Sequence, residues 1–594
     1  MTKDTLRAVS PDRVTLLPSP FKRRFELNRA YLMSLSNENL LQNYYMEAGL
    51  WHPRQRPEGI HWGWESPTCQ LRGHFLGHWL SAAAHIYANT GDAEVKAKGD
   101  RIVAELGRCQ RENGGEWAGS IPEKYLDWVA RGKPVWAPHY TVHKTLMGLH
   151  DMYALAGNEE ALDILRKWAN WFHRWTGQFS REQMDDILDV ETGGMLEVWA
   201  NLYAITGDER HLELMRRYDR PRLFEPLLVG KDVLTNKHAN TTIPEVQGAA
   251  RAWEVTGERR WRDIVEAYWQ TAVIERGYYC TGGQTCGEVW TPPGKLAARL
   301  GDKNQEHCVV YNMMRLAEYL LRWTGDPAYA DYWERNLYNG ILAQQHPDTG
   351  MVAYFLPLRA GEHKRWGTPT EDFWCCHGTL VQAHARFYTY STCFEDDDGL
   401  TVCQYIPCEL AWERSGVPVK VTLTFDPQIG EIHRPRQLAF RIDVEAEQPI
   451  EFALKLRVPW WVDGEAIIAV DGGAEPCQAA PGRFVSLRQT WHRNTVEIRL
   501  PKRLTTCPLP DHPEMVAFMD GPVVLVGLCD EERALHGDPE HPEAILVPDN
   551  EREWSFWLDG YRTVGQERGL RFIPLYEVRD ERYTVYFPLR PDRM

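Results

Sequence analysis

Two adjacent cysteines and a carboxylate–thiol pair are the residues of this chain whose types can do chemistry together. The cysteines lie in Asp372-Phe-Trp-Cys-Cys-His-Gly-Thr379, and the pair lies in Glu306-His-Cys308. One carboxylate and three thiolates form a reasonable tetrahedral set for zinc. The predicted ligands are Glu306, Cys308, Cys375 and Cys376. The spacing is not that of a zinc finger, so buried structural thiols are the alternative.

The adjacent cysteines need a particular backbone if they are to share an ion. Side chains of neighbouring residues diverge in a strand or a helix, so Cys375 and Cys376 can both reach one ion only in a turn, which Gly378 favours. A bound zinc ion lowers the pKa of a thiol, so one thiolate can attack an anomeric carbon while the other ligands hold the ion. The alternatives are a closed structural site and a site in which zinc-bound water attacks.

A glycosidase also needs an acid that protonates the departing oxygen. Glu288, in the glycine-rich Gly282-Gly-Gln-Thr-Cys-Gly-Glu-Val-Trp290, is the candidate, with an ordinary loop glutamate as the alternative. His143 and His238 open predicted helices, where a barrel mouth collects donors to sugar hydroxyls. His74 and His78 have the i, i+4 spacing of a metal pair but lack an acidic partner, so we expect them to pack or to line a pocket.

Helices over about the first 390 residues must position these groups. Residues 71–87, for example, carry apolar side chains at helical spacing. A glycine recurs after one helix and before the next, where a helix end needs a left-handed residue. These glycines are Gly91, Gly157, Gly207, Gly257 and Gly325. With a further helix near 381–390, six hairpins that close on themselves make an (α/α)6 barrel. An open solenoid is the alternative, and the unequal glycine intervals favour the barrel.

After about residue 395 the pattern changes to short alternating segments with turn residues between them. Residues 419–425, 438–444 and 451–458 alternate as half-buried strands do, which indicates a β-sandwich. We therefore predict a mainly α chain with C-terminal β: a catalytic (α/α)6 barrel over 1–395 and a β-sandwich domain over 396–530. Residues 531–594 form a C-terminal β extension or a second small β unit.

Composition restricts the classes of molecule that this chain can bind. The formal charge of −16, from 67 basic and 83 acidic side chains, argues against nucleic acid. No run of about 18 apolar residues exists, and the polar N-terminus predicts a cytoplasmic protein. In a reducing compartment, clustered members of the thirteen cysteines indicate metal binding or catalysis. The 25 Trp and 25 Tyr suit sugar stacking, although aromatic residues also fill large cores. The expected partner is a small oligosaccharide or glycoside, and a homodimer is left open.

The chain resembles the β-L-arabinofuranosidases of glycoside hydrolase families 127 and 146. The resemblance is carried by Gly287-Glu-Val-Trp290, Glu306-His-Cys308 and Phe373-Trp-Cys-Cys376, and extends in the family's order over nearly the whole chain. Further matching segments are residues 73–81, 136–144, 238–244, 311–316, 338–342 and 456–461. His377-Gly378-Thr379 follows the cysteine pair where some relatives have two prolines, which is closer to the family 146 branch. His307 and Cys286 are unexpected beside a site of this family.

The resemblance implies an (α/α)6 barrel followed by β-sandwich units, a zinc ion and retention of configuration. It also implies roles for individual residues. Cys375 corresponds to the nucleophile and Glu288 to the acid/base, while Glu306, Cys308 and Cys376 correspond to the other zinc ligands. His143, His238 and Tyr354 correspond to sugar-contacting positions.

We therefore expect an enzyme that releases terminal β-L-arabinofuranose or a closely related plant cell-wall sugar. Glu288 protonates the leaving oxygen as Cys375 attacks, and then activates water to release the sugar from the thioglycosyl enzyme. One alternative is a metal-free glycosidase of the same barrel class that pairs Glu288 with Asp185 or Asp186. The other is a non-catalytic carbohydrate-binding protein with a structural zinc.

Overall fold

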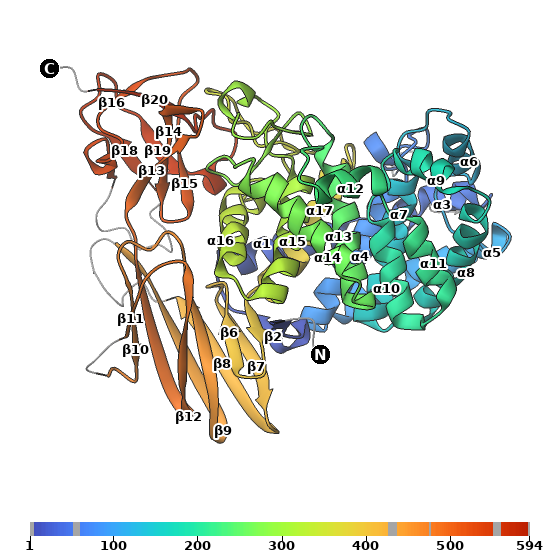
Figure 1. Ribbon diagram of the computed structural model, residues 1–594, viewed down its shortest axis with the longest axis horizontal. Coiled ribbons are helices and arrows are strands. Elements are labelled where there is room, and N and C mark those ends of the chain that lie inside the picture. The colour runs from blue at the N-terminus through green and yellow to red at the C-terminus, as the bar shows by residue number, and fades with distance from the viewer. Residues whose placement is uncertain (1–4, 52–59, 426–435, 474–476, 550–559, 592–594) are drawn as a thin grey trace.

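The computed structural model describes residues 5–51, 60–425, 436–473, 477–549 and 560–591. A helical body lies on the right of Figure 1, and two β-sheets lie beside it on the left, one above the other. Within these ranges, no helix combines the length and the apolar character that a membrane span requires.

Six inner helices pack side by side in a closed ring, because the last of them, α17, returns to the first, α4. This closure confirms the (α/α)6 barrel and excludes the open solenoid. In ring order, the inner helices are α4 (His74–Thr90), α7 (Pro138–Ala156), α10 (Met195–Thr206), α13 (Ala239–Thr256), α15 (His307–Thr324) and α17 (Cys375–Tyr390).

Each inner helix packs against one outer helix. Five outer helices follow their partners in the chain: α5 (Ala93–Glu112), α8 (Glu159–Thr176), α11 (Glu209–Arg217), α14 (Arg259–Trp269) and α16 (Pro327–Asn336). The sixth, α1 (Pro20–Ser34), comes from the N-terminal end of the chain and packs on α17. Shorter helices lie in the connections: α2 (Asn37–Leu40), α3 (Gln42–Glu47), α6 (Lys124–Ala130), α9 (Arg181–Leu188) and α12 (Pro221–Leu228).

The five recurring glycines end their helices as predicted. Gly91, Gly157, Gly207, Gly257 and Gly325 are left-handed C-caps with φ between 65° and 75°. At four of these corners the next residue caps the following helix with its side chain: Asp92, Asn158, Asp208 and Asp326 accept backbone N–H groups of the first turn. Such a cap stabilises a helix by about 1 kcal/mol.

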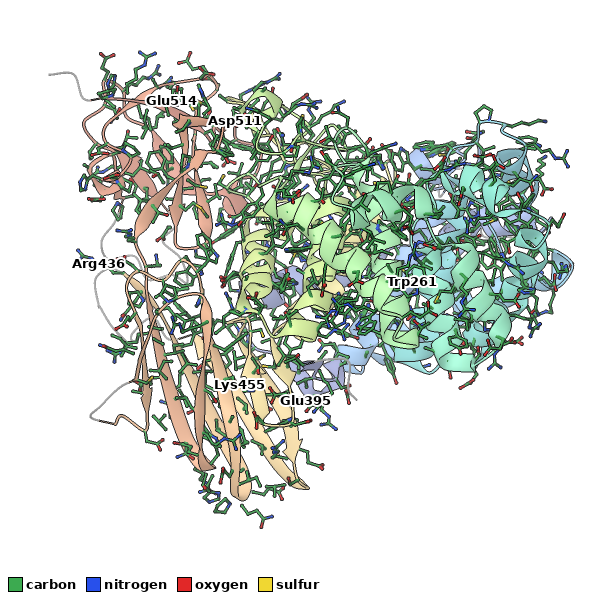
Figure 2. The ribbon with its side chains drawn as sticks, viewed as in Figure 1. Trp261, Glu395, Arg436, Lys455, Asp511 and Glu514 are labelled. Carbon is green, nitrogen blue, oxygen red and sulfur yellow. The ribbon has the colours of Figure 1, made fainter. Side chains whose placement is uncertain are left out.

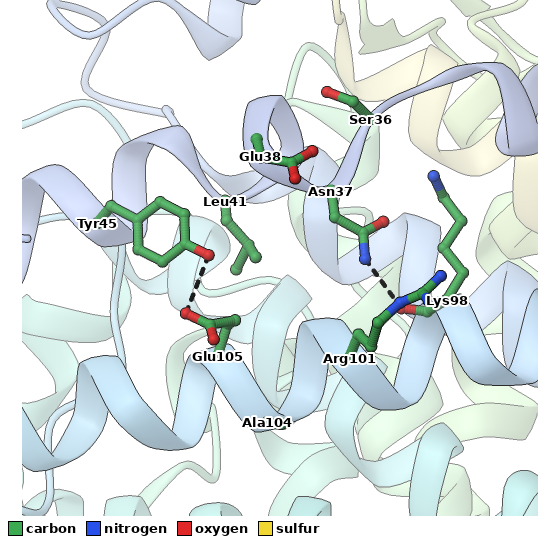
Figure 3. Close-up of a pocket in the computed structure, with 9 residues that line it drawn as sticks. All are labelled: Ser36, Asn37, Glu38, Leu41, Tyr45, Lys98, Arg101, Ala104 and Glu105. Atoms are coloured by element: carbon green, nitrogen blue, oxygen red, sulfur yellow. Dashed lines mark hydrogen bonds between the residues drawn. The ribbon is translucent and has the colours of Figure 1, made fainter. Parts of the chain in front are cut away.

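The outer surface of the barrel carries a polar cavity of about 560 Å³ between α2, α3 and α5 (Figure 3). Tyr45 donates a hydrogen bond to Glu105 across it, at 3.0 Å. Lys98 lines the same cavity, and its ammonium donates to the carbonyl oxygen of Leu35.

Among the described residues, the first sheet contains ten strands and includes two from the N-terminal part of the chain. β1 (Arg7–Ala8) pairs with β5 (Cys393–Glu395), and β2 (Val14–Leu16) pairs with β7 (Cys408–Arg414), so two strands that precede the barrel helices belong to this sheet. Its longest strands, β9 (Gln437–Val458) and β12 (Arg483–Pro501), are antiparallel neighbours. The remaining strands are β6 (Gly399–Val402), β8 (Val417–Phe425), β10 (Ala466–Val470) and β11 (Cys477–Ala479).

The second sheet contains eight strands within the described ranges, and the first two along the chain are β13 (Leu504–Leu509) and β14 (His512–Asp520). The others are β15 (Val523–Gly527), β16 (Leu535–His536), β17 (Leu546–Pro548), β18 (Tyr561–Thr563), β19 (Arg571–Pro574) and β20 (Phe587–Arg590). No composition change marks the passage from β12 to β13, so the pattern alone does not locate it.

Both sheets are fixed to the barrel by buried polar contacts. The fully buried Arg457 of β9 forms ion pairs with Asp331 and Glu334 of α16. Asp511, in the turn between β13 and β14 (Figure 2), accepts the backbone N–H groups of Leu296 and Ala297, each at 3.1 Å. The second contact holds the loop that follows Glu288.

Candidate active site

The four predicted ligands come together at the N-terminal ends of two neighbouring inner helices. Glu306 is the N-cap of α15 and Cys308 lies in its first turn, while Cys375 and Cys376 are the first two residues of α17. A helix N-terminus carries a partial positive charge, which stabilises thiolates and carboxylates. The predicted turn at the cysteine pair is wrong. Side chains in the first turn of α17 border its open end, so both sulfur atoms reach the donors of α15 without a turn.

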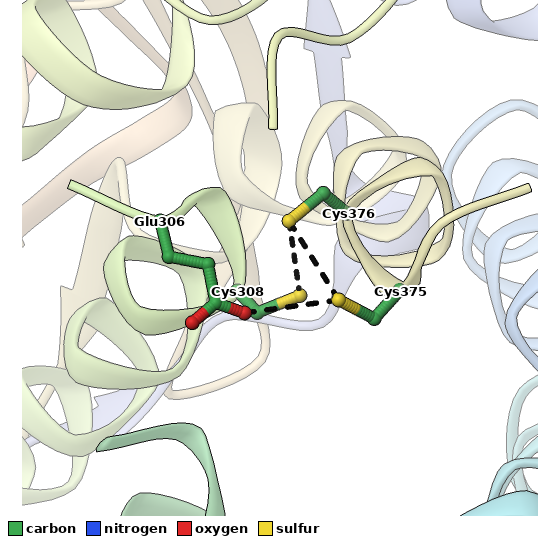
Figure 4. A group of neighbouring side chains, drawn as sticks. All are labelled: Glu306, Cys308, Cys375 and Cys376. Carbon is green, nitrogen blue, oxygen red and sulfur yellow. Dashed lines mark hydrogen bonds between the residues drawn. The ribbon is translucent and has the colours of Figure 1, made fainter. Parts of the chain in front are cut away.

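The donor atoms have the spacing of a tetrahedral metal site (Figure 4). The Cys376 sulfur lies 3.4 Å from the Cys308 sulfur and 3.8 Å from the Cys375 sulfur, and Cys375 Sγ lies 3.7 Å from Glu306 Oε1. One ligand atom from each of the four residues lies within 4.8 Å of the others. Zinc bonds of about 2.0–2.3 Å place the corners of a tetrahedron about 3.3–3.8 Å apart. The geometry therefore fits one ion.

The electrostatics of the cluster also fit a cation. Glu306 is 1% exposed, its Oε2 has no hydrogen-bond partner within the described ranges, and burial followed by the nearby Cys375 raises the pKa of its carboxyl group well above the ordinary value. Burial also raises the pKa values of Cys375 and Cys376. Burial opposes ionisation of Cys308 too, but hydrogen bonds from the other two thiols bring its pKa to about 7. Three thiolates and a carboxylate can therefore coexist only with a cation among them.

Gly378 serves close packing rather than a turn. A Cβ atom built on it would lie 2.1 Å from Cδ2 of His78 on α4, so α17 can approach α4 only with glycine there. The His78 ring is held by Gln382 of α17, with Nδ1 at 2.6 Å from Oε1. The rings of His74 and His78 are perpendicular, with centroids 6.1 Å apart, and both are buried. They therefore pack at the helix contact that positions the cysteine pair.

Tyr354 connects the candidate nucleophile to the candidate acid/base. The Cys375 thiol donates to the Tyr354 hydroxyl at 3.4 Å, and that hydroxyl donates to Glu288 Oε1. His238 Nε2 lies 4.0 Å from Glu288 Oε2, and its Nδ1 lies 2.7 Å from Thr241 Oγ1. One donor atom each of His238, Glu288 and Glu306 lies within 4.8 Å of the others. A single hydroxyl group thus lies between the thiol and Glu288.

Backbone strain concentrates around this site. The described chain has seven non-glycine residues with positive φ, and five of them belong to segments that carry site residues. Glu288 itself has φ 68°, Gln305 precedes Glu306, and Phe373 lies two residues before Cys375. The other two are Asn236, two residues before His238, and Ala137, the N-cap of α7. Such conformations cost roughly 1–3 kcal/mol each and persist where the surrounding structure enforces them, commonly at functional sites.

These groups line one cavity of about 200 Å³. It is smaller than the roughly 300–1,000 Å³ of pockets for drug-sized ligands, so it has room for one small sugar. Its lining comprises Trp64, Leu71, Trp136, Ala137, Tyr140, Glu191, His238, Asn240, Glu288, Glu306, Tyr354 and Cys375. Cys308 and Cys376 lie beneath it and are fully buried. Trp64 and Trp136 meet edge to face, with ring centroids 5.0 Å apart, and Trp136 is 47% exposed.

Three other predicted residues, His143, Asp185 and Asp186, neither line this cavity nor belong to the ligand cluster. His143 lines a second cavity of about 200 Å³ between the inner helices, together with Glu197 and Arg315. Asp185 and Asp186 lie on α9 and form ion pairs with Arg181 and Arg222. The structure therefore does not bring either aspartate to Glu288.

Glu191 is a lining carboxylate that the sequence analysis missed. It lies in the connection before α10, and burial raises the pKa of its carboxyl group. Its position beside Thr192-Gly193-Gly194, directly before an inner helix, is a signal that could have identified it.

His307 and His377, which lie next to the predicted ligands in the sequence, support the cluster from outside. His307 Nδ1 lies 2.9 Å from Thr379 Oγ1, which itself lies 3.2 Å from the Cys308 sulfur, so this contact joins α15 to α17. His377 Nδ1 accepts the Trp374 N–H at 3.1 Å, and its Nε2 lies 3.1 Å from the Thr368 carbonyl oxygen. Cys286 lies in β3 (Thr285–Cys286), which pairs with β4 (Val289–Trp290) around Glu288.

Comparison with protein families identifies two matching regions. Residues 13–389 match the GH127 catalytic domain of β-L-arabinofuranosidases, and residues 399–502 match the GH127 middle domain. A curated relative, the non-reducing end β-L-arabinofuranosidase of Bifidobacterium longum subsp. longum, is 24% identical over 457 residues, or 66% of this chain. That match covers 65% of the relative's own length.

Two solved structures share the fold over nearly their whole length. The GH127 β-L-arabinofuranosidase of Geobacillus stearothermophilus T6 has a TM-score of 0.71 at 19% identity, with 97% of this chain and 100% of that chain covered. A second GH127 β-arabinofuranosidase has a TM-score of 0.74 at 16% identity, with 99% of both chains covered. These likenesses agree with the (α/α)6 barrel and β-rich modules described above.

Proposed function

Because this chain belongs to glycoside hydrolase family 127, we propose that it is a zinc-dependent, retaining β-L-arabinofuranosidase. In this proposal Cys375 is the nucleophile, Glu288 is the acid/base, and Glu306, Cys308 and Cys376 complete the ligand set. The observation that carries it is one cavity lined by two of the proposed ligands, Glu306 and Cys375, in which the Tyr354 hydroxyl contacts both the Cys375 thiol and Glu288. The thirteen free cysteines support placement of the enzyme in the cytoplasm.

The proposed reaction follows from the positions of the chain's own side chains. A terminal β-L-arabinofuranosyl group lies in the cavity with its anomeric carbon at the Cys375 sulfur. Glu288 gives its proton to the departing oxygen as the sulfur bonds to carbon, and afterwards takes a proton from the water that releases the sugar. Among the described residues, only the Tyr354 hydroxyl lies between Cys375 and Glu288. Their separation is therefore closer to the roughly 5–5.5 Å between the two catalytic groups of retaining enzymes than to the roughly 6.5–9.5 Å of inverting ones.

The remaining lining residues bind and shield the sugar in this proposal. His238, Asn240 and Glu191 offer donors and acceptors to its hydroxyl groups, while Trp64 and Trp136 cover the mouth of the cavity. Zinc, when bound, supplies a positive charge that keeps Cys375 ionised and makes its sulfur a competent leaving group.

The proposal is tested by metal analysis and a screen of aryl glycosides with and without a chelator. We expect bound zinc and release of the aryl group from β-L-arabinofuranoside that the chelator abolishes. Cys375→Ser should stop turnover, whereas Cys477→Ser, at an exposed cysteine of β11, should leave it unchanged. An active wild-type enzyme without metal, or substantial activity of Cys375→Ser, would contradict the proposal.

A further inference from the structure

Lys144 is a buried lysine without a conventional partner. Four lysines are buried in the described chain, and three of them are satisfied: Lys98 and Lys364 donate to backbone carbonyl groups, and Lys502 pairs with Asp520. Lys144 is 6% exposed, yet within the described ranges no carboxylate lies within 4.0 Å of its ammonium group and no hydrogen bond reaches it. A buried cation in this state is costly unless another charge compensates it.

The surroundings of Lys144 point toward the thiol cluster. Its Nζ lies 4.5 Å from the centroid of the Tyr140 ring, one turn earlier on α7. Tyr140 lines the cavity with Cys375 and packs in one buried cluster with Cys308 and Cys376. The backbone of Lys144 packs against Gly77 of α4, where a Cβ atom would lie 2.0 Å from the Lys144 carbonyl. The lysine is therefore fixed behind the tyrosine that covers the cluster.

Among the basic side chains near the cluster, Lys144 carries a positive charge that no carboxylate of the described residues pairs with. Burial lowers its pKa to about 8, while the negative charges of Cys308, Glu191 and Cys375 act in the opposite direction, so the group is mainly charged at neutral pH. The neighbouring His78 and His143 are neutral there, because burial and then Lys144 hold their pKa values well below 6.5. Arg315, which also acts on Lys144, is paired with Glu197.

The charge of the proposed ligand set favours a positive group nearby. Glu306 and three thiolates carry four negative charges, and a divalent ion neutralises two of them. The remaining two lie in a site with almost no access to water, where the helix N-termini offer only about half a charge each. We propose that Lys144 is the counter-cation of this cluster, a positioning residue that stabilises the metal-bound form through Tyr140 without touching metal or sugar. This inference rests on the metal site of the proposed function.

The inference is tested with Lys144→Met, which keeps the length of the side chain and removes its charge. Lys98→Met is the matched control. Lys98 lies on the outer helix α5 (Figure 3), is similarly buried, and its Nζ lies 5.5 Å from the centroid of the Trp79 ring. Cobalt(II) binding to the purified chains is followed by thiolate-to-metal absorption, in competition with a chelator. Thermal unfolding of the same chains is measured after the metal has been removed.

We expect Lys144→Met to weaken metal binding by about 10- to 100-fold, the usual effect of losing a group that supports metal ligands from outside. Its metal-free form should unfold at the wild-type temperature or higher, since an unpaired buried charge has been removed. Lys98→Met should bind metal as the wild type does. Wild-type affinity in Lys144→Met, or a weaker affinity accompanied by an equally destabilised metal-free form, overturns the inference. A wild-type chain that binds no metal overturns the proposed zinc site together with it.

Discussion

Gly378→Ala tests whether the close contact between α17 and α4 sets the position of the cysteine pair. The new Cβ atom would lie 2.1 Å from the His78 ring, more than an ångström short of the ordinary contact distance of about 3.5 Å. The ring is buried and hydrogen-bonded to Gln382, so the first turn of α17 has to move. Overpacking of this kind costs about 1–3 kcal/mol, and the better helix propensity of alanine returns about 1 kcal/mol.

The net loss of stability is therefore about 0–2 kcal/mol, but the loss of activity should be larger. Metal sites tolerate only about 0.2 Å of error in ligand distance, and a displacement of about 1 Å near a reacting centre costs about 100-fold in rate. Metal content, kcat/KM and urea unfolding are the measurements. Gly91→Ala is the control, because a Cβ there meets nothing within 4 Å and only left-handed strain of about 1–2 kcal/mol is added. Wild-type metal content and kcat/KM in Gly378→Ala would refute this reasoning.

Two further variants test the roles of single side chains. Tyr354→Phe removes the hydroxyl between Cys375 and Glu288 and should lower kcat by about 100-fold at unchanged metal content, so a kcat within about threefold of wild type would exclude the role of that hydroxyl. His139 is fully buried and burial lowers its pKa to about 3, so the unfolded chain binds this proton first and stability is lost as pH falls below 6.5. In His139→Phe the loss of unfolding free energy between pH 6.5 and 5 should be about 2 kcal/mol smaller, and an unchanged loss would show that this histidine is not responsible.

The sequence predicted the helical hairpins because their ends obey a local rule. A left-handed glycine followed by a capping residue is readable at Gly91 or Gly325 without knowledge of the rest of the chain. The sixth outer helix, α1, was not predicted, since its partner α17 lies more than 300 residues away in the sequence. The same holds for β1 and β2, because the strands that they pair with, β5 and β7, follow the last barrel helix in the sequence.

The ligand set was identifiable by residue type, but its geometry was not. Glu306 and Cys375 are separated in the sequence by α15, α16 and the connection to α17, and only the packing of α15 beside α17 brings them together. A position near the mouth of the barrel, as read from the sequence, was likewise insufficient to place a residue in the active-site cavity. His143 and Tyr140 belong to the same segment, residues 136–144. Tyr140 lines the cavity with Cys375, whereas His143 lines the second cavity. Gly193 and Gly194 accommodate the His143 ring there, since a Cβ on either would lie less than 3.0 Å from it.

In the proposed mechanism, the sulfur of Cys375 bonds to the sugar during turnover. The most direct measurement is peptide mass spectrometry of the enzyme after acid quenching during reaction with an activated aryl β-L-arabinofuranoside. We expect one pentosyl group on the peptide that contains Cys375 and none in Cys375→Ser. A pentosyl group on a carboxylate such as Glu288 or Glu191, or turnover without any label on Cys375, would contradict it.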